Sequence, residues 1–258
     1  MTGDLPDAVR HRLTGRVPLS RIKTVDLPRH DAAVAAKLLA LPDLASAVAD
    51  ALDELGVGAV LTTEALAPLA SDMRVCGPAV TLRYVRANAD PPVVRSAGTR
   101  LVVADRDLYG VACPGDVAVF DCGGNRDWAV AGGLSAEWAR KAGVAGCVVD
   151  GAVRDTATIV DSGLPVWSAN RSPRAARYRV DAVAINDVVT IAGTAVRPGD
   201  YIVADADGVC VVPFEHLPAV TDSCIAAQAA EDALLGAIRA SSDLTELVLR
   251  TGGRSAPE

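Results

Sequence analysis

Short Val-rich apolar runs alternate with glycine-bounded, helix-like segments between residues 100 and 170. Four strands are predicted there, at 101–105 (LVVAD), 117–124 (VAVFDCGG), 145–151 (AGCVVDG) and 164–169 (LPVWSA). Helices are predicted between them, at 132–143 (GGLSAEWARKAG) and from 154 (RDTATIVDSG). Alternating strands and helices joined by short turns indicate an α/β domain.

A second group of strands is predicted after residue 180, with no helix between its members. These are DVVTIAG, then a turn and strand in VRPGDYIVA, then GVCVVP. The group argues against a simple doubly wound sheet and favours a layered β/β/α arrangement. Helical spacing predicts helices at 43–55 and at about 215–240. The short echo of ADRD (104–107) and ADAD (204–207) is interpreted as coincidence.

We expect a single folded domain at 43–240, an N-terminal extension at 1–42 containing a helix, and a C-terminal helix or tail at 241–258. The 258 residues are 50% hydrophobic but only 3% aromatic, which is typical of Ala- and Val-rich α/β layers. The net charge of −7 and the lack of Lys/Arg runs argue against nucleic acid as a partner. With no apolar signal core and no run of ~20 apolar residues, we expect a cytoplasmic protein without a membrane partner.

The cysteines and histidines narrow the chemistry. None of the six cysteines forms a C-x-x-C pair, so buried free thiols are favoured over disulfides or zinc ligands. Only His11, His30 and His216 occur, two of them in the polar N-terminal extension. A Ser-His-Asp triad or a multi-histidine metal site is therefore improbable. Chemistry must depend on carboxylates, arginine, backbone amides and a hard metal ion.

Two segments are candidates for that chemistry. In the first, Gly132 and Gly133 open a helix ahead of Leu134 and Ser135, and exposed N–H groups at a helix start favour a carboxylate or phosphate. The alternative is a tight strand-to-helix turn with close backbone packing and no ligand.

In the second segment, the apolar run around Val148 ends in a polar turn that holds Arg154 and Asp155. Ligands bind at the carboxyl ends of strands in open α/β sheets. The guanidinium could hold an oxygen that gains negative charge, and the carboxylate could bind Mg²⁺ or Mn²⁺. The alternative is a helix cap, with Asp155 in the first turn and Arg154 paired to a neighbour.

The stretch GGLSAEWARKAGVAGCVVDGAVRDTATIVDSGLPVWS resembles the RraA-like family, as do CGPAVTL, PGDVAVFDCGG and VRPGDYIVADADGVCVVP. That family includes 4-hydroxy-4-methyl-2-oxoglutarate aldolases, which also decarboxylate oxaloacetate, and the regulator of ribonuclease activity A. The resemblance covers residues 43–240 and implies a layered β/β/α fold of the swivelling-domain type, assembled as a homotrimer or a hexamer.

The resemblance also implies residue roles. Arg154 would polarise the 2-oxo group and the developing enolate, and Asp155 would bind the metal directly or through water. Amides at Leu134 and Ser135 would hold the substrate carboxylate. An acid from the C-terminal helix of a neighbouring subunit would complete the site, with Glu231 as the candidate.

This sequence departs from the aldolase pattern at one position. The pattern has an Asp, then twenty intervening residues, then Arg-Asp, and this chain has Gly133 at the position of the Asp. Compensation could come from Asp150, Asp121 or Glu137. A metal-dependent lyase acting on a small 2-oxo acid is the leading hypothesis. The alternatives are a non-catalytic regulatory protein of the ribonuclease-regulator type and a specialised-metabolism lyase or hydratase with another substrate.

Overall fold

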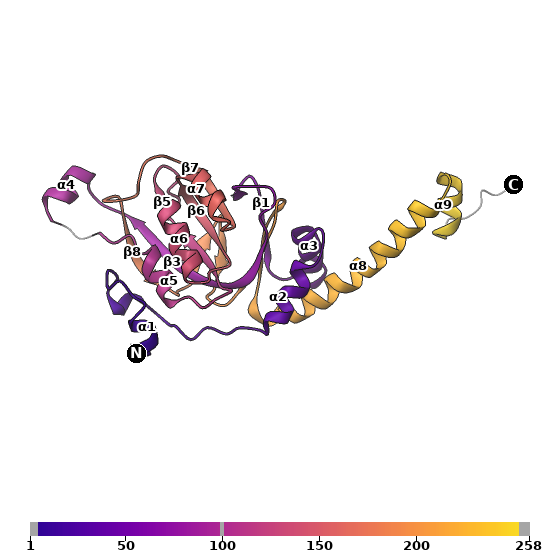
Figure 1. The fold of residues 1–258 in the computed structure, drawn as a ribbon, viewed down its shortest axis with the longest axis horizontal. Coiled ribbons are helices and arrows are strands. Elements are labelled where there is room, and N and C mark those ends of the chain that lie inside the picture. Colours follow the sequence, from indigo (N-terminus) through magenta and orange to yellow (C-terminus); the bar gives the residue numbers. More distant parts are fainter. Residues whose placement is uncertain (1–4, 99–100, 253–258) are drawn as a thin grey trace.

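The computed structural model describes residues 5–98 and 101–252 (Figure 1). Its helices are α1 (Asp7–Arg10), η1 (Leu19–Arg21), α2 (Ala32–Leu39), α3 (Leu44–Leu55), α4 (Pro91–Ser96), α5 (Asp105–Val111), α6 (Gly133–Lys141), α7 (Thr156–Ser162), η2 (Phe214–His216), α8 (Leu217–Ala240) and α9 (Leu244–Arg250). Its strands are β1 (Ala59–Thr62), β2 (Ala67–Pro68), β3 (Val75–Arg86), β4 (Val117–Asp121), β5 (Ala129–Ala131), β6 (Gly146–Val153), β7 (Val166–Arg171), β8 (Val180–Ile185), β9 (Val189–Ile191), β10 (Thr194–Val196), β11 (Tyr201–Ala204) and β12 (Gly208–Val212).

Ten of these strands form one mixed sheet in the order β1-β12-β11-β3-β4-β6-β7-β2, with β5 beside β6 and β8 beside β3. Its centre is parallel, since β3, β4, β6 and β7 all run in the same direction. The strands β11, β12 and β1 continue it in antiparallel pairs. The helices between the central strands supply the crossovers that parallel neighbours require.

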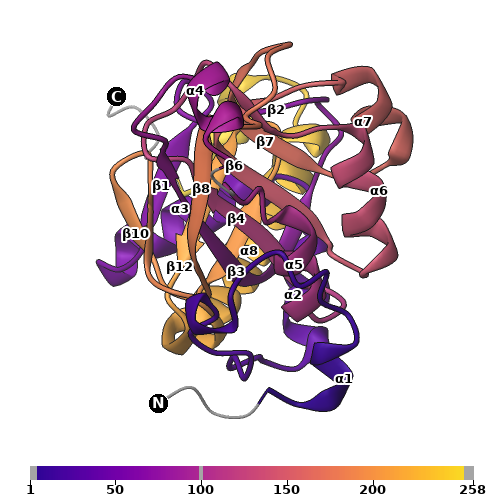
Figure 2. The same ribbon diagram turned by 90° about the vertical axis from the view of Figure 1, so that its left-hand side faces the viewer.

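Successive side chains of the central strands enter two different cores, which makes the fold layered. In β4, Ala118 and Phe120 pack toward α5, α6 and α7, whereas Val117 and Val119 pack toward the β9–β12 region. Both faces of the strand are therefore apolar, as expected for a parallel sheet covered on both sides. Figure 2 shows α6 and α7 together on one side of the sheet. The predicted layered mixed α/β fold is confirmed.

A third core lies at the β11–β12 end, where α2, α3 and the first half of α8 cover the sheet. Beyond that core, α8 projects away from the body and carries α9 at its tip (Figure 1). Within the described residues, no single helix has the length and apolarity to cross a membrane. Only α2 and α3 taken together have that length and apolarity, and these two helices are bent by 112° relative to each other.

One strand prediction was wrong. Residues 101–104 form no strand, and Asp105 begins α5 instead. The Val102 amide donates to the Asp181 carboxylate at 2.9 Å, and the Val102 carbonyl accepts from Ala182 at 3.0 Å. The segment is anchored beside β8 by isolated hydrogen bonds, so its apolar residues are buried without a strand ladder.

The described part of the N-terminal extension packs on its own chain and is mostly non-helical. Val17, Ile22 and Leu27 are buried in the same core as α5 and α6. The Asp107 carboxylate, itself 1% exposed, accepts hydrogen bonds from the backbone N–H groups of Thr14, Arg16 and Val17 and from the Thr14 hydroxyl. Because buried carboxylates require such partners, the segment and α5 stabilise each other.

A second anchor is the ion pair between Arg29 and the fully buried Asp116. Nε and Nη2 of Arg29 donate to the two Asp116 oxygens at 2.9 and 2.8 Å. The Asp116 side chain is 0% exposed and that of Arg29 is 27% exposed. Removing the guanidinium would leave a buried carboxylate with only the Cys113 amide as a described partner.

We predict that Arg29→Ala lowers the free energy of unfolding by about 3 kcal/mol, the lower end for breaking a buried ion pair, because Arg29 is partly exposed. Urea denaturation followed by circular dichroism measures the change. Arg95→Ala, which removes an exposed arginine of α4, should stay within about 0.5 kcal/mol of wild type. Equal stabilities of the two variants would contradict a stabilising role for the Arg29–Asp116 pair.

Candidate functional site

Two strand-to-helix turns lie side by side at the carboxyl edge of the sheet. β5 and β6 pair in parallel, with Ala131 opposite Val153, and the Arg154 amide donates to the Ala131 carbonyl at 3.1 Å. β5 then leads through Gly132 into α6, and β6 leads through Arg154 and Asp155 into α7. The two segments singled out in the sequence are therefore brought together.

Asp155 has an unusual backbone and a side chain turned away from its own helix. Its φ of 54° and ψ of 42° lie in the left-handed region, which is uncommon for a residue other than glycine. The side chain makes no capping hydrogen bond to α7. Its Oδ2 instead accepts from the Gly133 amide at 3.3 Å and lies 3.5 Å from Arg154 Nε. This geometry disfavours a capping role for the Asp155 side chain, whereas the other part of that alternative, pairing of Arg154 with a neighbour, is observed. Backbone strain of this kind is concentrated at functional sites.

Glycine is needed at positions 132 and 133 because the backbone there lies close to side chains of the β6–α7 turn and of α7. A Cβ added to Gly132 would lie 2.7 Å from Asp155 Oδ2 and 3.0 Å from Arg154 Cγ. At Gly133, the added Cβ would lie 2.7 Å from Thr158 Cγ2 and 3.0 Å from Thr158 Cβ. Thr158 on α7 therefore occupies the space that an acidic side chain at position 133 would need.

The first turn of α6 presents unused amides to the same place. The first hydrogen bond of the helix runs from the Ala136 amide to the Gly132 carbonyl. The N–H groups of Leu134 and Ser135 precede it and have no acceptor in a preceding turn. Together with the helix dipole they favour an anion. The close packing that the tight-turn alternative assumed is also present at Gly132, so the packing does not distinguish the two interpretations.

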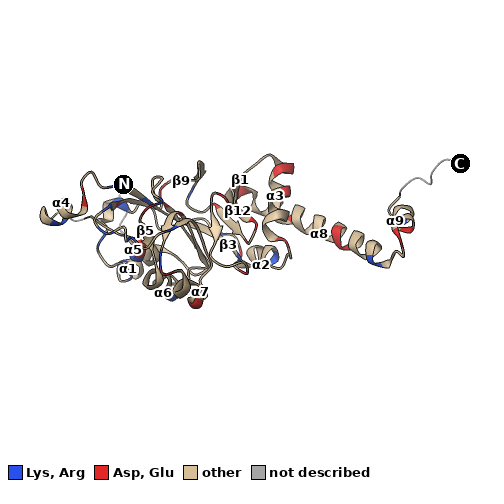
Figure 3. Ribbon diagram, turned by 90° about the horizontal axis from the view of Figure 1, so that it is seen from above, with Lys and Arg blue, Asp and Glu red and all other residues tan. Residues whose placement is uncertain are grey.

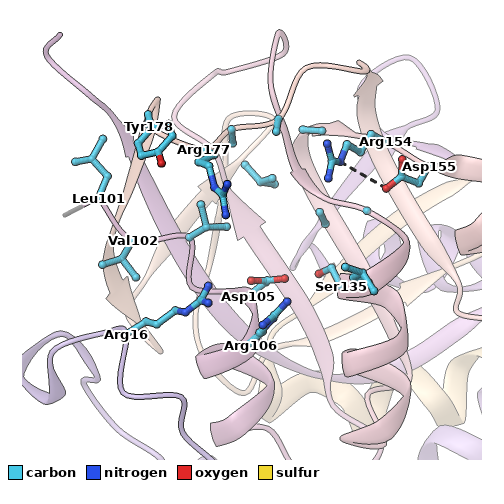
Figure 4. A pocket seen from close by; sticks show the side chains of 18 residues that line it. Arg16, Leu101, Val102, Asp105, Arg106, Ser135, Arg154, Asp155, Arg177 and Tyr178 are labelled. Atoms are coloured by element: carbon cyan, nitrogen blue, oxygen red, sulfur yellow. Dashed lines mark ion pairs between the residues drawn. The ribbon is translucent and has the colours of Figure 1, made fainter. Parts of the chain in front are cut away.

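These groups open into a cavity of about 600 Å³, shown in Figure 4. Its polar lining residues are Arg16, Asp105, Arg106, Ser135, Arg154, Asp155, Arg177 and Tyr178. Arg154 and Asp155 lie at one end of the cavity, and Asp105 lies on its floor among Arg16, Arg106 and Arg177 (Figure 4). The volume falls within the range of small-molecule sites.

Asp105 lines the cavity near Ser135. The Ser135 hydroxyl in turn forms a 2.9 Å hydrogen bond with the hydroxyl of the buried Tyr109. Burial raises the pKa of the Asp105 carboxyl, against the opposing effects of Ser135 and of the nearby Arg106 and Arg16 charges. A carboxyl with a raised pKa facing a cavity is a candidate for proton transfer.

Several cavity residues were missed from the sequence. Asp105 and Arg106 lie in the ADRD segment interpreted as coincidence, and Arg16 lies in the extension placed outside the domain. The acidic start of α5 directly after the apolar run LVV was the available signal for Asp105. Nothing local marks Arg16 or Arg177, since both reach the cavity only through tertiary packing.

The suggested supporting acids lie elsewhere in the chain. Asp150 accepts from the Ala192 amide at 2.8 Å, and Asp121 accepts from the Gly123 and Thr190 amides. Both hold backbone around the β9–β10 hairpin, and neither lines the cavity. Glu231 lies on α8 and lines a different cavity, against α3. The structure therefore does not bring these three acids to Asp155 within one chain.

Asp155 is the residue whose chemistry fits a hard cation. Its side chain is 48% exposed at the cavity, and among the described residues no hydrogen bond to its second oxygen, Oδ1, is found. The described residues hold no cluster of three or more His, Cys, Asp or Glu ligands. A single carboxylate suits Mg²⁺, which keeps several water ligands and takes others from substrate oxygens.

The cysteines are free, as predicted, and five of the six are buried. Burial raises the pKa of Cys76, Cys147 and Cys210 to about 12. A thiol with so high a pKa is protonated at neutral pH and is a poor nucleophile. The chemistry of the cavity therefore rests on its carboxylates, arginines and amides.

The packing around Gly133 leads to a test by double substitution. We predict that Gly133→Asp lowers the free energy of unfolding by about 1–3 kcal/mol, the usual cost of overpacking, because its Cβ meets Thr158. Thr158→Ala removes the nearer methyl and should recover most of that loss in the double variant. Urea denaturation of the four proteins measures the coupling. Additive effects of the two substitutions would show that Thr158 is not the obstacle.

Comparison with known proteins identifies the family of this chain. Residues 45–211 match the RraA-like family, described as Aldolase/RraA. The chain is 30% identical over 200 residues to Protein DlpA of Legionella pneumophila, which covers 77% of this chain but only 31% of that longer protein. It is 34% identical over 166 residues to a Halalkalibacterium halodurans protein named as a candidate 4-hydroxy-4-methyl-2-oxoglutarate aldolase, covering 64% of this chain and 70% of the relative.

Solved structures show the same fold. An uncharacterized protein from Pseudomonas syringae pv. tomato superposes with a TM-score of 0.70 at 25% identity, covering 85% of this chain and 98% of the other. Streptomyces coelicolor RraAS2, described as an unusual member of the RNase ES inhibitor RraA protein family, gives a TM-score of 0.66 at 25% identity, covering 80% and 98%. The sequence match and the shared fold together show that this chain belongs to the RraA-like family.

Proposed function

We propose that this protein is a divalent-metal-dependent lyase that cleaves a carbon–carbon bond in a small 2-oxo acid, such as 4-hydroxy-4-methyl-2-oxoglutarate or oxaloacetate. The observation that carries the proposal is the arrangement of Arg154 and Asp155 beside the unused amides of α6, facing one cavity. The name of the Halalkalibacterium halodurans relative supports the same reaction class.

Each residue has a part in such a reaction. The amides of Leu134 and Ser135 bind the substrate carboxylate, and the Arg154 guanidinium binds the 2-oxo oxygen. As the carbon–carbon bond breaks, its electron pair forms the enolate double bond and the carbonyl electrons move to that oxygen, where Arg154 stabilises the charge. The departing group leaves as carbon dioxide in decarboxylation, with a proton supplied by solvent. In aldol cleavage it leaves as a carbonyl compound, and its hydroxyl releases the proton that balances protonation of the enolate. Protonation of the enolate carbon then yields the product 2-oxo acid.

Asp155 is the residue that would hold Mg²⁺ or Mn²⁺, directly or through water. When bound, the cation would supply Lewis-acid stabilisation of the negative charge on the substrate oxygens. The contact from the Gly133 amide keeps the Asp155 carboxylate pointed away from α7 and toward the cavity.

We predict different effects for substitutions at the two residues. Asp155→Asn keeps the shape but removes the charge that holds a hard cation, so metal affinity and turnover should fall together. Arg154→Lys should still bind metal, but it loses the planar two-pronged contact, which is expected to cost about 10²–10³ in turnover. Calorimetry with Mg²⁺ and Mn²⁺, and a pyruvate-release assay on a panel of 2-oxo acids, measure the two quantities.

Asp161→Asn is the matched control, because Asp161 is an exposed carboxylate on the same helix as Thr158 and lies outside the cavity. It should change neither metal affinity nor turnover. The melting temperature of metal-free Asp155→Asn should barely differ from that of wild type. Equal metal affinity in wild type and Asp155→Asn would refute the metal-lyase proposal at its centre.

One observation favours the alternative, a non-catalytic regulatory protein. Gly133 removes an acid of the aldolase pattern, and Thr158 fills its place. A regulator would show no metal-dependent pyruvate release from any 2-oxo acid of the panel. It would also leave its function unchanged when Arg154 is replaced by Lys.

We further propose that the protein works as a homotrimer or a hexamer. The helices α8 and α9 expose apolar side chains, namely Ile225, Leu234, Ile238, Leu244, Val248 and Leu249, and all but Ile225 lie on the projecting half of α8 or on α9. Most of the α8 ribbon is drawn as uncharged in Figure 3. Further copies of this chain would cover that surface, and in such an assembly Glu231 could approach the site of a neighbouring subunit.

We predict that multi-angle light scattering at micromolar concentration gives three or six times the 26.5 kDa chain mass. Leu234→Glu combined with Ile238→Glu should shift the protein toward monomers, because two charges would be buried at the contact. A wild-type protein that elutes at the monomer mass would contradict the proposed assembly.

A further inference from the structure

The cavity carries an excess of positive charge beyond Arg154, the one arginine that was assigned a part in the proposed reaction. Four arginines and two aspartates line it, in a protein whose net charge is −7. Arg154 is paired with Asp155 at one end. At the other end, Arg16, Arg106 and Arg177 lie around the single carboxylate of Asp105 (Figure 4). One carboxylate cannot neutralise three guanidinium groups, so this end of the cavity stays cationic.

We propose that Arg16, Arg106 and Arg177 form a second anion subsite, which binds an acidic group at the far end of the substrate. This inference rests on the proposed binding of a 2-oxo acid at Arg154. Guanidinium groups suit such a subsite, because each offers paired N–H donors to a carboxylate or a phosphate. Both substrates proposed above carry a second carboxylate, and these three arginines would hold that group, or a phosphate ester in its place.

The dimensions of the cavity support this extended substrate. Its volume of about 600 Å³ is in the range of sites for drug-sized ligands, and it exceeds what a three-carbon acid fills. Apolar side chains, including Val102 and Val130, line the same cavity as the two charged ends. A carbon chain carrying an acid at each end matches that lining.

A hydrogen bond from its backbone amide positions Arg16 at the cavity. The Asp107 carboxylate accepts from the Arg16 amide at 3.1 Å and from the Val17 amide at 2.9 Å. Val17 is 4% exposed and packs in the core beside α5. Arg106 is the residue before Asp107 in α5, so the buried carboxylate holds the backbone of Arg16 close to that of Arg106.

The position of Arg16 gives the N-terminal segment a functional role. It lies outside residues 45–211, the part of the chain that matches the family. The segment therefore adds part of the wall and one positive charge to the cavity. All the other lining residues lie within the part of the chain that matches the family. Arg16 is a specificity-determining residue in this view, and Arg154 binds the reacting end.

The test uses three ligands that share the 2-oxo acid head and differ at the far end. These are 2-oxoglutarate with a carboxylate, 2-oxo-4-phosphonobutyrate with a phosphonate, and 2-oxopentanoate with a methyl group. Calorimetry on the full-length protein with Mg²⁺ measures their affinities. Wild type should bind at least one acidic ligand about tenfold or more tightly than 2-oxopentanoate. The tighter of the two acidic ligands identifies the group that the subsite prefers.

Arg16→Gln should reduce that preference about tenfold and leave 2-oxopentanoate binding within about twofold. Arg16→Lys should retain part of the preference, because the charge remains while the paired donors are lost. Lys23→Gln is the matched control: it removes one exposed charge from the same segment outside the cavity, and it should change nothing. Equal melting temperatures would show that the variants are folded.

Arg154→Lys separates this proposal from the proposed function. It should weaken all three ligands by a similar factor, whereas Arg16→Gln should weaken only the acidic ones. If Arg154→Lys changes no affinity and Arg16→Gln still acts on the acidic ligands, the proposed function fails and the subsite stands. Wild type that binds none of the ligands, or that shows no preference for an acidic end, overturns the subsite. An unchanged preference in Arg16→Gln overturns it as well.

Discussion

The contact between Gly132 and the Asp155 carboxylate determines the shape of the site. Parallel pairing of β5 with β6 places their two following turns side by side, and a Cβ at position 132 would lie 2.7 Å from Asp155 Oδ2. Without that Cβ, the Gly133 amide reaches the carboxylate, and the left-handed backbone of Asp155 turns its side chain away from α7. The orientation of Arg154 and the unused amides of α6 both depend on this close approach.

Buried carboxylates outside the site hold the N-terminal segment against the family domain. Asp107 binds the backbone around Arg16, and Asp116 binds Arg29. Both acids are buried. Asp107 accepts its described hydrogen bonds from the segment, and Asp116 accepts from Arg29 of the segment and from the Cys113 amide. Detaching the segment would therefore leave buried carboxylates without these partners. As a result, a stretch with little regular secondary structure becomes a fixed wall of the cavity.

Most of the regular elements follow from local pattern. The strands predicted at 117–124, 145–151 and 164–169 correspond to β4, β6 and β7, and the glycine-bounded segments correspond to α6 and α7. The run LVVAD was wrongly predicted as a strand. Its apolar residues indicate burial, but here they are buried in an irregular segment that is hydrogen-bonded beside β8. Short strands such as β2 and β5 carry no distinctive period and form only because a neighbour pairs with them.

The sequence by itself determined the layered α/β fold and the free buried cysteines, and it predicted a site at the turn of Arg154 and Asp155. These follow from hydrophobic period, glycine placement and the short spacing between an apolar strand and its polar end. Only the tertiary structure decided that Asp105, Arg106, Arg177 and Arg16 share one cavity with them, and that Asp121 and Asp150 do not. The physical reason is that such contacts join residues distant in the chain, where the direction of each side chain is determined by packing rather than by neighbours in sequence.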